Sequence, residues 1–348
     1  MLPENLICTS NVSNDLEGFF SKNHFSKTGI LVDENTKKHC LPLISSAVSH
    51  SQIIEIPSGE IYKNIETCKH IWSSMTNAGF DRSSLLINLG GGVICDMGGF
   101  CAATFKRGIE FINIPTTLLA QVDAGFGGKT GIDFLSLKNQ LGVFIEPIAM
   151  IADPVFFATL NERHFRAGLA EIIKHSLIAD NDFFQYLLTT SFDKIEWTET
   201  IQRSIKIKNS FVVQDPFEEE SRKSLNFGHT IGHAVESYFI GKDGELVHGE
   251  AVAIGLICEC FLSAIKLGLP ESDLQDVSRL ILSNFGSRKI SPESFPEIMN
   301  YLNNDKKNID GRVLMTLIPG IGKVKVNVEV SGEEIIKSFS FYNHFAKG

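Results

Sequence analysis

The hydrophobic pattern changes near Asp153-Pro154, and this change constrains the fold more than any other feature of the chain. Before it, apolar runs are short, rich in Ile and Val, and separated by Gly, Pro, Asn or Asp. Such runs predict buried strands, with the best candidates at 29–32, 53–56, 85–89, 109–114 and 149–152. Because helical stretches such as 65–78 lie between them, we expect alternating strands and helices around a mostly parallel sheet.

After this point the apolar residues follow the helical period in longer segments. They predict helices over 163–178, 195–213, 224–239, 249–267 and 271–284, a short extended piece near 313–318 and a final helix over 332–345. A chain of 348 residues is about twice a common domain length. We therefore expect two domains, an α/β domain over residues 1–160 and an α-helical domain over residues 161–348.

Charge and composition exclude several classes of partner. The chain has 32 Lys and Arg against 41 Asp and Glu, and no basic run is longer than a pair, so nucleic acid is a poor candidate ligand. The most apolar segment, 251–258, is far shorter than the ~20 residues of a membrane span, and the N-terminus lacks the pattern of a secretion signal. Seven cysteines without a C-x-x-C motif favour a reducing cytoplasm.

Two glycine-rich segments could bind phosphate groups. The strand at 85–89 runs into Gly90-Gly91-Gly92, where the backbone can approach an anion, although a tight turn would explain the same glycines. Lys129 lies in a second glycine-rich stretch, 123–131, which begins at Asp123 and offers N–H groups together with an ammonium. Asp123 stands where a P-loop has its first Gly, so a triphosphate site is not expected.

Four residues could bind a metal ion. His229 and His233 are four apart, so on a helix both rings project from one face, and Gly228 and Gly232 would leave room beside them. Thr230 replaces the Glu of zinc proteases, which excludes that mechanism. Glu171 and His248 are further candidate ligands. Two alternatives stay open: the histidines could be ordinary core residues, and Glu171 could form an i,i+3 salt bridge with Lys174.

Polar residues precede this histidine pair. Arg222 and Asn226 lie seven and three residues before His229, on successive turns toward the same site, although most cations are simply solvated. The acidic cluster 218–220 is typical of a solvated turn.

These segments, in this order, resemble the sugar phosphate cyclase family and in particular its 3-dehydroquinate synthases. The similarity runs from about residue 29 to residue 323 and is carried by the motifs at 90–100, 107–108, 114–123, 127–131, 138–139, 167–174, 222–236, 248–251 and 305–307. Agreement at so many separated motifs is highly specific. The resemblance implies a Rossmann-like nucleotide-binding domain followed by an all-α domain that binds metal and substrate.

The resemblance also implies two cofactors. Glu171, His229 and His248 would hold zinc or cobalt. NAD would contact residues of the N-terminal domain, namely Asp33, Asn35, Glu60, Lys63, Gly91, Gly92, Asp96, Thr116, Thr117, Asp123, Lys138, Phe156 and Thr159.

The substrate implied is 3-deoxy-D-arabino-heptulosonate 7-phosphate, which carries a carboxylate and a phosphate. Lys208 and Arg222 would bind the carboxylate, and the phosphate would be surrounded by Arg107, Lys129, Asn139 and Lys306. Arg107 would come from the neighbouring subunit of a homodimer. The residues implied to handle protons or orient alcohols are Lys174, Asn226, His233, Lys129 and Asp123.

The reaction implied is a transient oxidation by NAD, β-elimination of phosphate, reduction, ring opening and intramolecular aldol closure to 3-dehydroquinate. The alternatives are a valiolone-type or inosose-type cyclase, whose substrates lack the carboxylate, and a metal-dependent polyol dehydrogenase, which would release NADH. A non-catalytic protein that binds NAD or a sugar phosphate is a further alternative.

Overall fold

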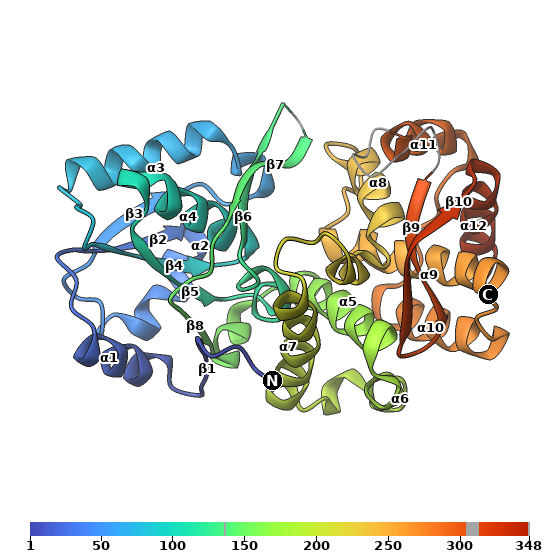
Figure 1. The fold of residues 1–348 in the computed structure, drawn as a ribbon, viewed down its shortest axis with the longest axis horizontal. Helices are drawn as coiled ribbons and strands as arrows, with labels where there is room; N and C mark the ends of the chain where they lie inside the picture. Colours follow the sequence, from blue (N-terminus) through green and yellow to red (C-terminus); the bar gives the residue numbers. More distant parts are fainter. Residues whose placement is uncertain (136, 304–312, 347–348) are drawn as a thin grey trace. The chain divides into compact units, whose positions relative to one another are not determined.

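The computed structural model describes residues 1–135, 137–303 and 313–346. The chain forms two compact units, Met1–Phe165 and Arg166–Gly348 (Figure 1). The domain boundary predicted after residue 160 stays a prediction. Across the described residues, every helix is too short or too polar to cross a bilayer.

The N-terminal unit contains a six-stranded sheet in which all neighbouring strands run parallel. The strand order is β1-β8-β5-β4-β2-β3. The strands are β1 (Leu6–Cys8), β2 (Thr28–Asp33), β3 (Gln52–Ile56), β4 (Leu85–Gly90), β5 (Glu110–Pro115) and β8 (Ala149–Ala152). The predicted parallel sheet is confirmed, and the short edge strand β1 adds to it.

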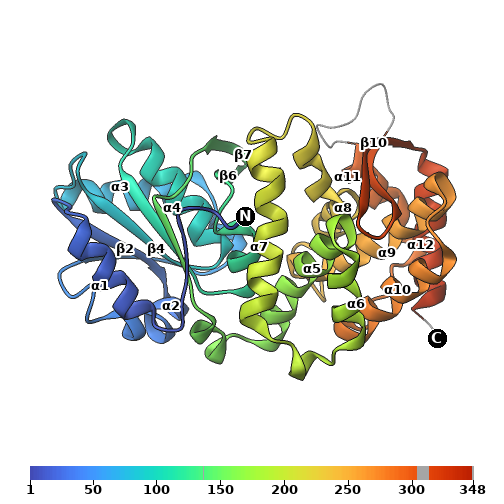
Figure 2. The same ribbon diagram turned by 60° about the horizontal axis from the view of Figure 1, so that its bottom comes forward.

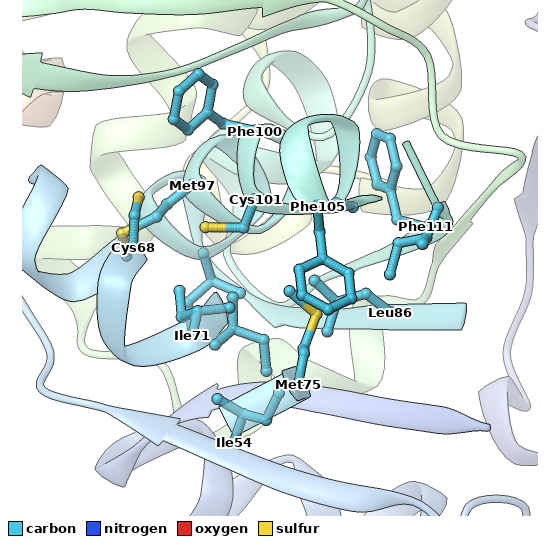
Figure 3. Close-up of a cluster of buried hydrophobic side chains, with 14 of the residues drawn as sticks. Ile54, Cys68, Ile71, Met75, Leu86, Met97, Phe100, Cys101, Phe105 and Phe111 are labelled. Atoms are coloured by element: carbon cyan, nitrogen blue, oxygen red, sulfur yellow. The ribbon is translucent and has the colours of Figure 1, made fainter. Parts of the chain in front are cut away.

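Side chains alternate between two apolar cores, one on each face of this sheet. Leu86 of β4 points into the core beneath α3 (Ile65–Asn77) and α4 (Gly92–Thr104), as Figure 3 shows. Leu85 and Ile87 point to the other core, which α1 (Val12–Lys22) and the segment after α2 (Glu34–His39) cover. Because both faces of the inner part of the sheet are buried, an inner strand such as β4 is almost continuously apolar. The edge strand β3 is partly exposed and carries Gln52 and Glu55.

Helix α4 packs closely on both of its sides because it carries two adjacent glycines. A Cβ at Gly98 would lie 1.9 Å from Asn88 Oδ1 of β4. A Cβ at Gly99 would lie 2.5 Å from Thr130 Cγ2 in the antiparallel hairpin of β6 (Lys129–Phe134) and β7 (Leu137–Phe144). The glycines therefore let α4 fit between sheet and hairpin.

The C-terminal unit is mainly helical. Its long central helix is α9 (His248–Leu267), which is buried along most of its length and packs against α8 (His229–Phe239), α10 (Glu271–Phe285) and α12 (Gly332–Phe345) (Figure 2). The other described elements are α5 (Glu162–Ala179, which begins in the N-terminal unit), α6 (Asn181–Thr189), α7 (Trp197–Gln214), α11 (Phe295–Asn303), and the antiparallel strands β9 (Val313–Gly320) and β10 (Lys323–Val330).

One prediction about local structure in this unit is corrected and another is confirmed. The single helix expected over 224–239 is a 3-10 turn over Ser221–Asn226 followed by α8. The chain breaks between them because Gly228 has a left-handed φ of 81°. The extended piece expected near 313–318 is confirmed as β9, which forms a hairpin with β10, a strand of alternating polar and apolar residues.

We expect Gly98→Ala to destabilise the N-terminal unit by about 1–3 kcal/mol, since the added methyl overlaps Asn88 in a close-packed core. The matched control is Gly18→Ala in α1, where nothing lies within 4 Å of the new Cβ. There the better helix propensity of Ala should leave stability unchanged or raise it by up to about 1 kcal/mol. Urea unfolding of both variants checks this, and equal shifts would contradict it.

Candidate active site

The direction in which the chain adds strands to the sheet reverses between β2 and β4. Strand β3 lies on one side of β2 and β4 on the other, and β5 and β8 follow outward from β4. In open parallel sheets, ligands bind beyond the carboxyl ends of the strands at such a reversal. Asp33 ends β2 and Gly90 ends β4, so the segments that follow are in the expected position for a nucleotide site.

The residues predicted to bind NAD gather at this edge of the sheet. With the exception of Lys138, which lies in β7, all of them end or follow a sheet strand at its carboxyl end. They comprise Asp33 and Asn35 after β2, Glu60 and Lys63 after β3, Gly91, Gly92 and Asp96 after β4, Thr116, Thr117 and Asp123 after β5, and Phe156 and Thr159 after β8.

The N-terminus of α4 offers backbone donors to an anion. No side chain caps this helix start, which follows Gly91. A Cβ at Gly91 would lie 3.2 Å from Thr117 Cγ2, and one at Gly92 would lie 3.2 Å from Ala124 Cβ, so the glycines keep the segment compact. The first N–H groups of a helix and its dipole favour a phosphate or pyrophosphate.

A buried ammonium joins two groups of predicted residues. Lys63 Nζ donates to Asp96 Oδ2 at 2.6 Å and to Asn139 Oδ1 at 2.8 Å. Burial lowers the pKa of Lys63, but the carboxylates of Asp96, Glu60 and Asp133 together outweigh burial and hold the pKa above its ordinary value, so Lys63 stays charged. Asn139, predicted beside the substrate phosphate, is therefore bound to a residue of the predicted NAD set. Lys138 Nζ lies 3.6 Å from Glu60 Oε1.

Some residues of the predicted NAD set have structural roles. Asp33 Oδ1 accepts from the backbone N–H of Thr36 at 2.7 Å and so caps α2. Phe156 is buried in the apolar core on the α1 face of the sheet. Asn35 and Thr159 are exposed.

Lys129 and Arg107, two predicted phosphate ligands of the N-terminal unit, lie at or beside turns. Lys129 is the exposed first residue of β6, after a glycine-rich turn that follows Asp123. Arg107 has a left-handed φ of 72°, and Lys106 before it has a φ of 51°. Arg82 Nε donates to the carbonyl oxygen of Lys106 at 3.1 Å. Two successive non-glycine residues in this region store backbone strain, which is typical of functional turns.

In the C-terminal unit, a fully buried carboxylate faces two histidines. Glu171 Oε1 of α5 lies 3.3 Å from His229 Nε2 and 3.6 Å from His248 Nε2. Glu171 Oε2 also contacts the ammonium of Lys174, one turn along α5. The salt bridge and the approach to both histidines, considered as alternatives from the sequence, are thus present together.

These groups have the chemistry of a divalent-cation site. Burial raises the pKa of Glu171, but Lys174 and His229 outweigh it and hold the pKa well below its ordinary value, so the carboxylate is ionised. From the described residues, its oxygens accept no well-aligned hydrogen bond although two ring nitrogens face them. One carboxylate and two imidazoles match the ligands of zinc and related metals. One ring nitrogen of His233 lies within 4.8 Å of one ring nitrogen each of His229 and His248, which lie within the same distance of each other.

Two buried cations lie on elements that pack against each other. Lys208 of α7 is 5% exposed and Arg222, in the 3-10 turn over Ser221–Asn226, is 2% exposed. Arg222 Nη1 donates to the carbonyl oxygen of Pro216 at 2.6 Å. Lys306, predicted to bind the phosphate, lies outside the described residues.

Two interpretations of this region are corrected. The acidic cluster is not only a solvated turn, because half-buried Glu218 accepts from Asn226 Nδ2 at 3.0 Å. No sequence pattern marks Glu218 apart from its neighbours. Gly228 and Gly232 do not leave space beside the histidines, since α9 fills it: a Cβ at Gly232 would lie 3.1 Å from the Ala251 carbonyl oxygen.

The sequence matches two family models. The one described as 3-dehydroquinate synthase N-terminal covers residues 53–167, and the one described as 3-dehydroquinate synthase C-terminal covers residues 168–308. The 3-dehydroquinate synthase of Parabacteroides distasonis is 38% identical over 347 residues, which is 98% of each chain.

Two solved structures share the fold closely. The 2-epi-5-epi-valiolone synthase of Streptomyces hygroscopicus, with NAD+ and Zn2+ bound, has a TM-score of 0.88 at 25% identity and covers 99% of this chain and 98% of its own. A 2-deoxy-scyllo-inosose synthase complexed with carbaglucose-6-phosphate, NAD+ and Co2+ has a TM-score of 0.84 at 25% identity, with coverage of 96% and 95%.

Proposed function

The chain belongs to the 3-dehydroquinate synthase family, and on that premise we propose that it converts 3-deoxy-D-arabino-heptulosonate 7-phosphate to 3-dehydroquinate and phosphate. It would act as a phosphate-eliminating carbon–oxygen lyase. The observation that supports this most is the approach of both His229 and His248 to the buried carboxylate of Glu171. We also propose a cytoplasmic location, because the seven cysteines of the sequence include no C-x-x-C motif.

We propose that the N-terminal unit binds NAD at the carboxyl edge of its sheet, and that Glu171, His229 and His248 hold a divalent cation, zinc or cobalt. Bound NAD supplies a hydride acceptor that is regenerated in each turnover, and the cation supplies Lewis acidity toward hydroxyl groups. The N–H groups at the start of α4 would bind the pyrophosphate. Lys63 would hold Asp96 and Asn139 in place through its two hydrogen bonds.

The charges of the proposed substrate account for the cations of the site. Lys208 and Arg222 would bind its carboxylate, Arg222 in the bidentate geometry that a guanidinium allows. Lys129, Asn139, Lys306 and the partner-derived Arg107 would surround its phosphate. Lys208 and Arg222 are buried and lie on elements that pack against each other, which favours a substrate with a carboxylate. The substrates of the valiolone-type and inosose-type cyclases lack this carboxylate, so they would not supply its negative charge to the two cations.

We propose proton-handling roles from the position and contacts of each group. His233 is half-buried beside the rings of His229 and His248, with centroids 5.2 and 5.6 Å away, so its ring can accept or return a proton. Lys174, held by Glu171, would orient a substrate oxygen. The Asn226 amide donates to Glu218 in this structure and would donate to the bound substrate instead. Asp123 and Lys129, which belong to the N-terminal unit, would also transfer protons or orient alcohol groups.

The central test is turnover of the heptulosonate phosphate with NAD far below the substrate concentration. We expect phosphate and 3-dehydroquinate in equal amounts, no accumulation of NADH, and loss of activity with a chelator that zinc or cobalt reverses. Stoichiometric NADH would instead indicate a polyol dehydrogenase. Faster turnover of a heptulose phosphate without the carboxylate would indicate one of the other cyclases, and phosphate release insensitive to chelation would refute the cation site.

For Arg222→Lys we expect kcat/KM to fall about tenfold to 100-fold, because lysine cannot make the paired charge-assisted hydrogen bonds. NAD affinity should stay unchanged. The matched control is Arg203→Lys, which alters an arginine of α7 that is paired with Asp180 at 2.8 Å. Steady-state kinetics and NAD titration measure both quantities. An equal loss of NAD affinity in Arg222→Lys would contradict the assigned role.

We propose that the protein is a homodimer in which Arg107 completes the partner subunit's site, and subunit mixing tests this. Arg107→Ala and Glu171→Gln should each be inactive alone. Heterodimers of the two would contain one intact site, so random reassociation should restore about a quarter of wild-type activity. Sedimentation establishes the dimer. If Arg107 served its own subunit, the mixture would stay inactive.

A further inference from the structure

Helices α8 and α9 cross in antiparallel fashion at very short distance. A Cβ at Gly255 of α9 would lie 1.9 Å from the carbonyl oxygen of Gly228, just before α8, and Gly232 lies against Ala251 near the start of α9. The start of each helix therefore faces a later turn of the other. His229 is the first residue of α8 and His248 is the first residue of α9.

A carboxylate of α9 binds the start of α8. Glu259 is fully buried, at 0% exposure. Its Oε2 accepts from the backbone N–H of Gly228 at 2.6 Å, and its Oε1 accepts from that of Ile231 at 3.0 Å. The first N–H groups of a helix have no acceptor within the helix, and no cap residue of its own supplies one to α8. A buried negative charge at this positive helix end fixes the turn that carries His229.

A carboxylate of α8 in turn binds the start of α9. Glu236 is also buried, and its Oε2 lies 3.3 Å from His248 Nδ1. When Nδ1 donates to this carboxylate, Nε2 of His248 is left to face Glu171. The same tautomer is favoured in His229, whose Nδ1 lies 3.2 Å from the carbonyl oxygen of Phe227. Both rings thus present Nε2.

We propose that Glu236 and Glu259 form a reciprocal carboxylate clamp, in which each helix fixes the histidine at the start of the other. This inference rests on the cation site proposed above. Both glutamates are positioning residues that act through His229 and His248. The clamp sets the two Nε2 atoms at the separation at which they and Glu171 can share one ion.

The substitution Glu→Gln keeps the shape of each side chain and removes its charge. In Glu259→Gln, only the amide oxygen can still accept a hydrogen bond. The NH2 group would therefore face one of the two backbone N–H groups, donor against donor. We expect the zinc affinity of the metal-free protein to fall about tenfold to 100-fold in Glu259→Gln and in Glu236→Gln, as loss of a ligand-orienting carboxylate does in other metal sites. The visible absorption of the cobalt-loaded protein should change in both variants. Glu259→Asp, which keeps the charge, should bind zinc more tightly than Glu259→Gln.

The matched control is Glu334→Gln. Glu334 Oε2 accepts from the backbone N–H of Ser331 at 2.8 Å at the start of α12. This variant therefore weakens the start of a helix in the same unit, but α12 carries none of the site histidines. Its zinc affinity and cobalt spectrum should equal those of the wild type. Zinc affinity is measured by competition with a chromophoric chelator, and thermal unfolding of the metal-free proteins is followed alongside.

The outcomes separate the two proposals. If both Gln variants keep wild-type zinc affinity and cobalt spectra while their thermal midpoints fall, the glutamates are merely structural and the clamp is refuted. If Glu259→Gln does not fold, Glu259→Asp and Glu236→Gln decide the matter by the same measurements. Failure of the wild-type protein to bind zinc would refute the proposed cation site, and the clamp with it.

Discussion

The buried charge of Glu171 is the constraint on which the C-terminal unit depends. A carboxylate with no exposed surface has lost its hydration, and this loss costs several kcal/mol unless positive or polar groups replace the water. Lys174 comes from the same helix, but His229 and His248 must be brought from two other helices. The arrangement of α5, α8 and α9 can therefore be understood as the scaffold that surrounds one carboxylate.

Close helix packing makes this scaffold possible. Glycine at 255 lets α9 approach the backbone before α8, and a Cβ at Gly249 would lie 2.2 Å from the carbonyl oxygen of Ala167 in α5. These glycines cost helix propensity, about 1 kcal/mol each relative to alanine. They allow the two histidines to reach Glu171 from the first turns of their helices, where a carboxylate from the neighbouring helix can hold them.

The sequence predicted the features that depend on local periodicity. The mainly apolar strands β2 to β5 and the helices α3, α9 and α10 follow from the spacing of their own residues, and so does the Glu171–Lys174 contact. Contacts between distant segments did not follow. Glu259 binds groups 31 and 28 residues away in sequence, and nothing in the pattern of α9 distinguishes it from other helix residues. The late start of α8 likewise depends on a left-handed Gly228, which periodicity does not reveal.

The two proposed binding regions use different chemistry, and this difference has a consequence for how such a protein can change. At the start of α4 the donors are backbone N–H groups shaped by glycines, so a side-chain substitution elsewhere leaves them in place. In the C-terminal unit the groups proposed to recognise ligands are side chains, chiefly Lys208, Arg222 and the histidines. Substitution of one or two of these side chains can therefore shift substrate preference. The positive groups around Glu171 must be kept, because a buried carboxylate without them would destabilise the helices that carry the site.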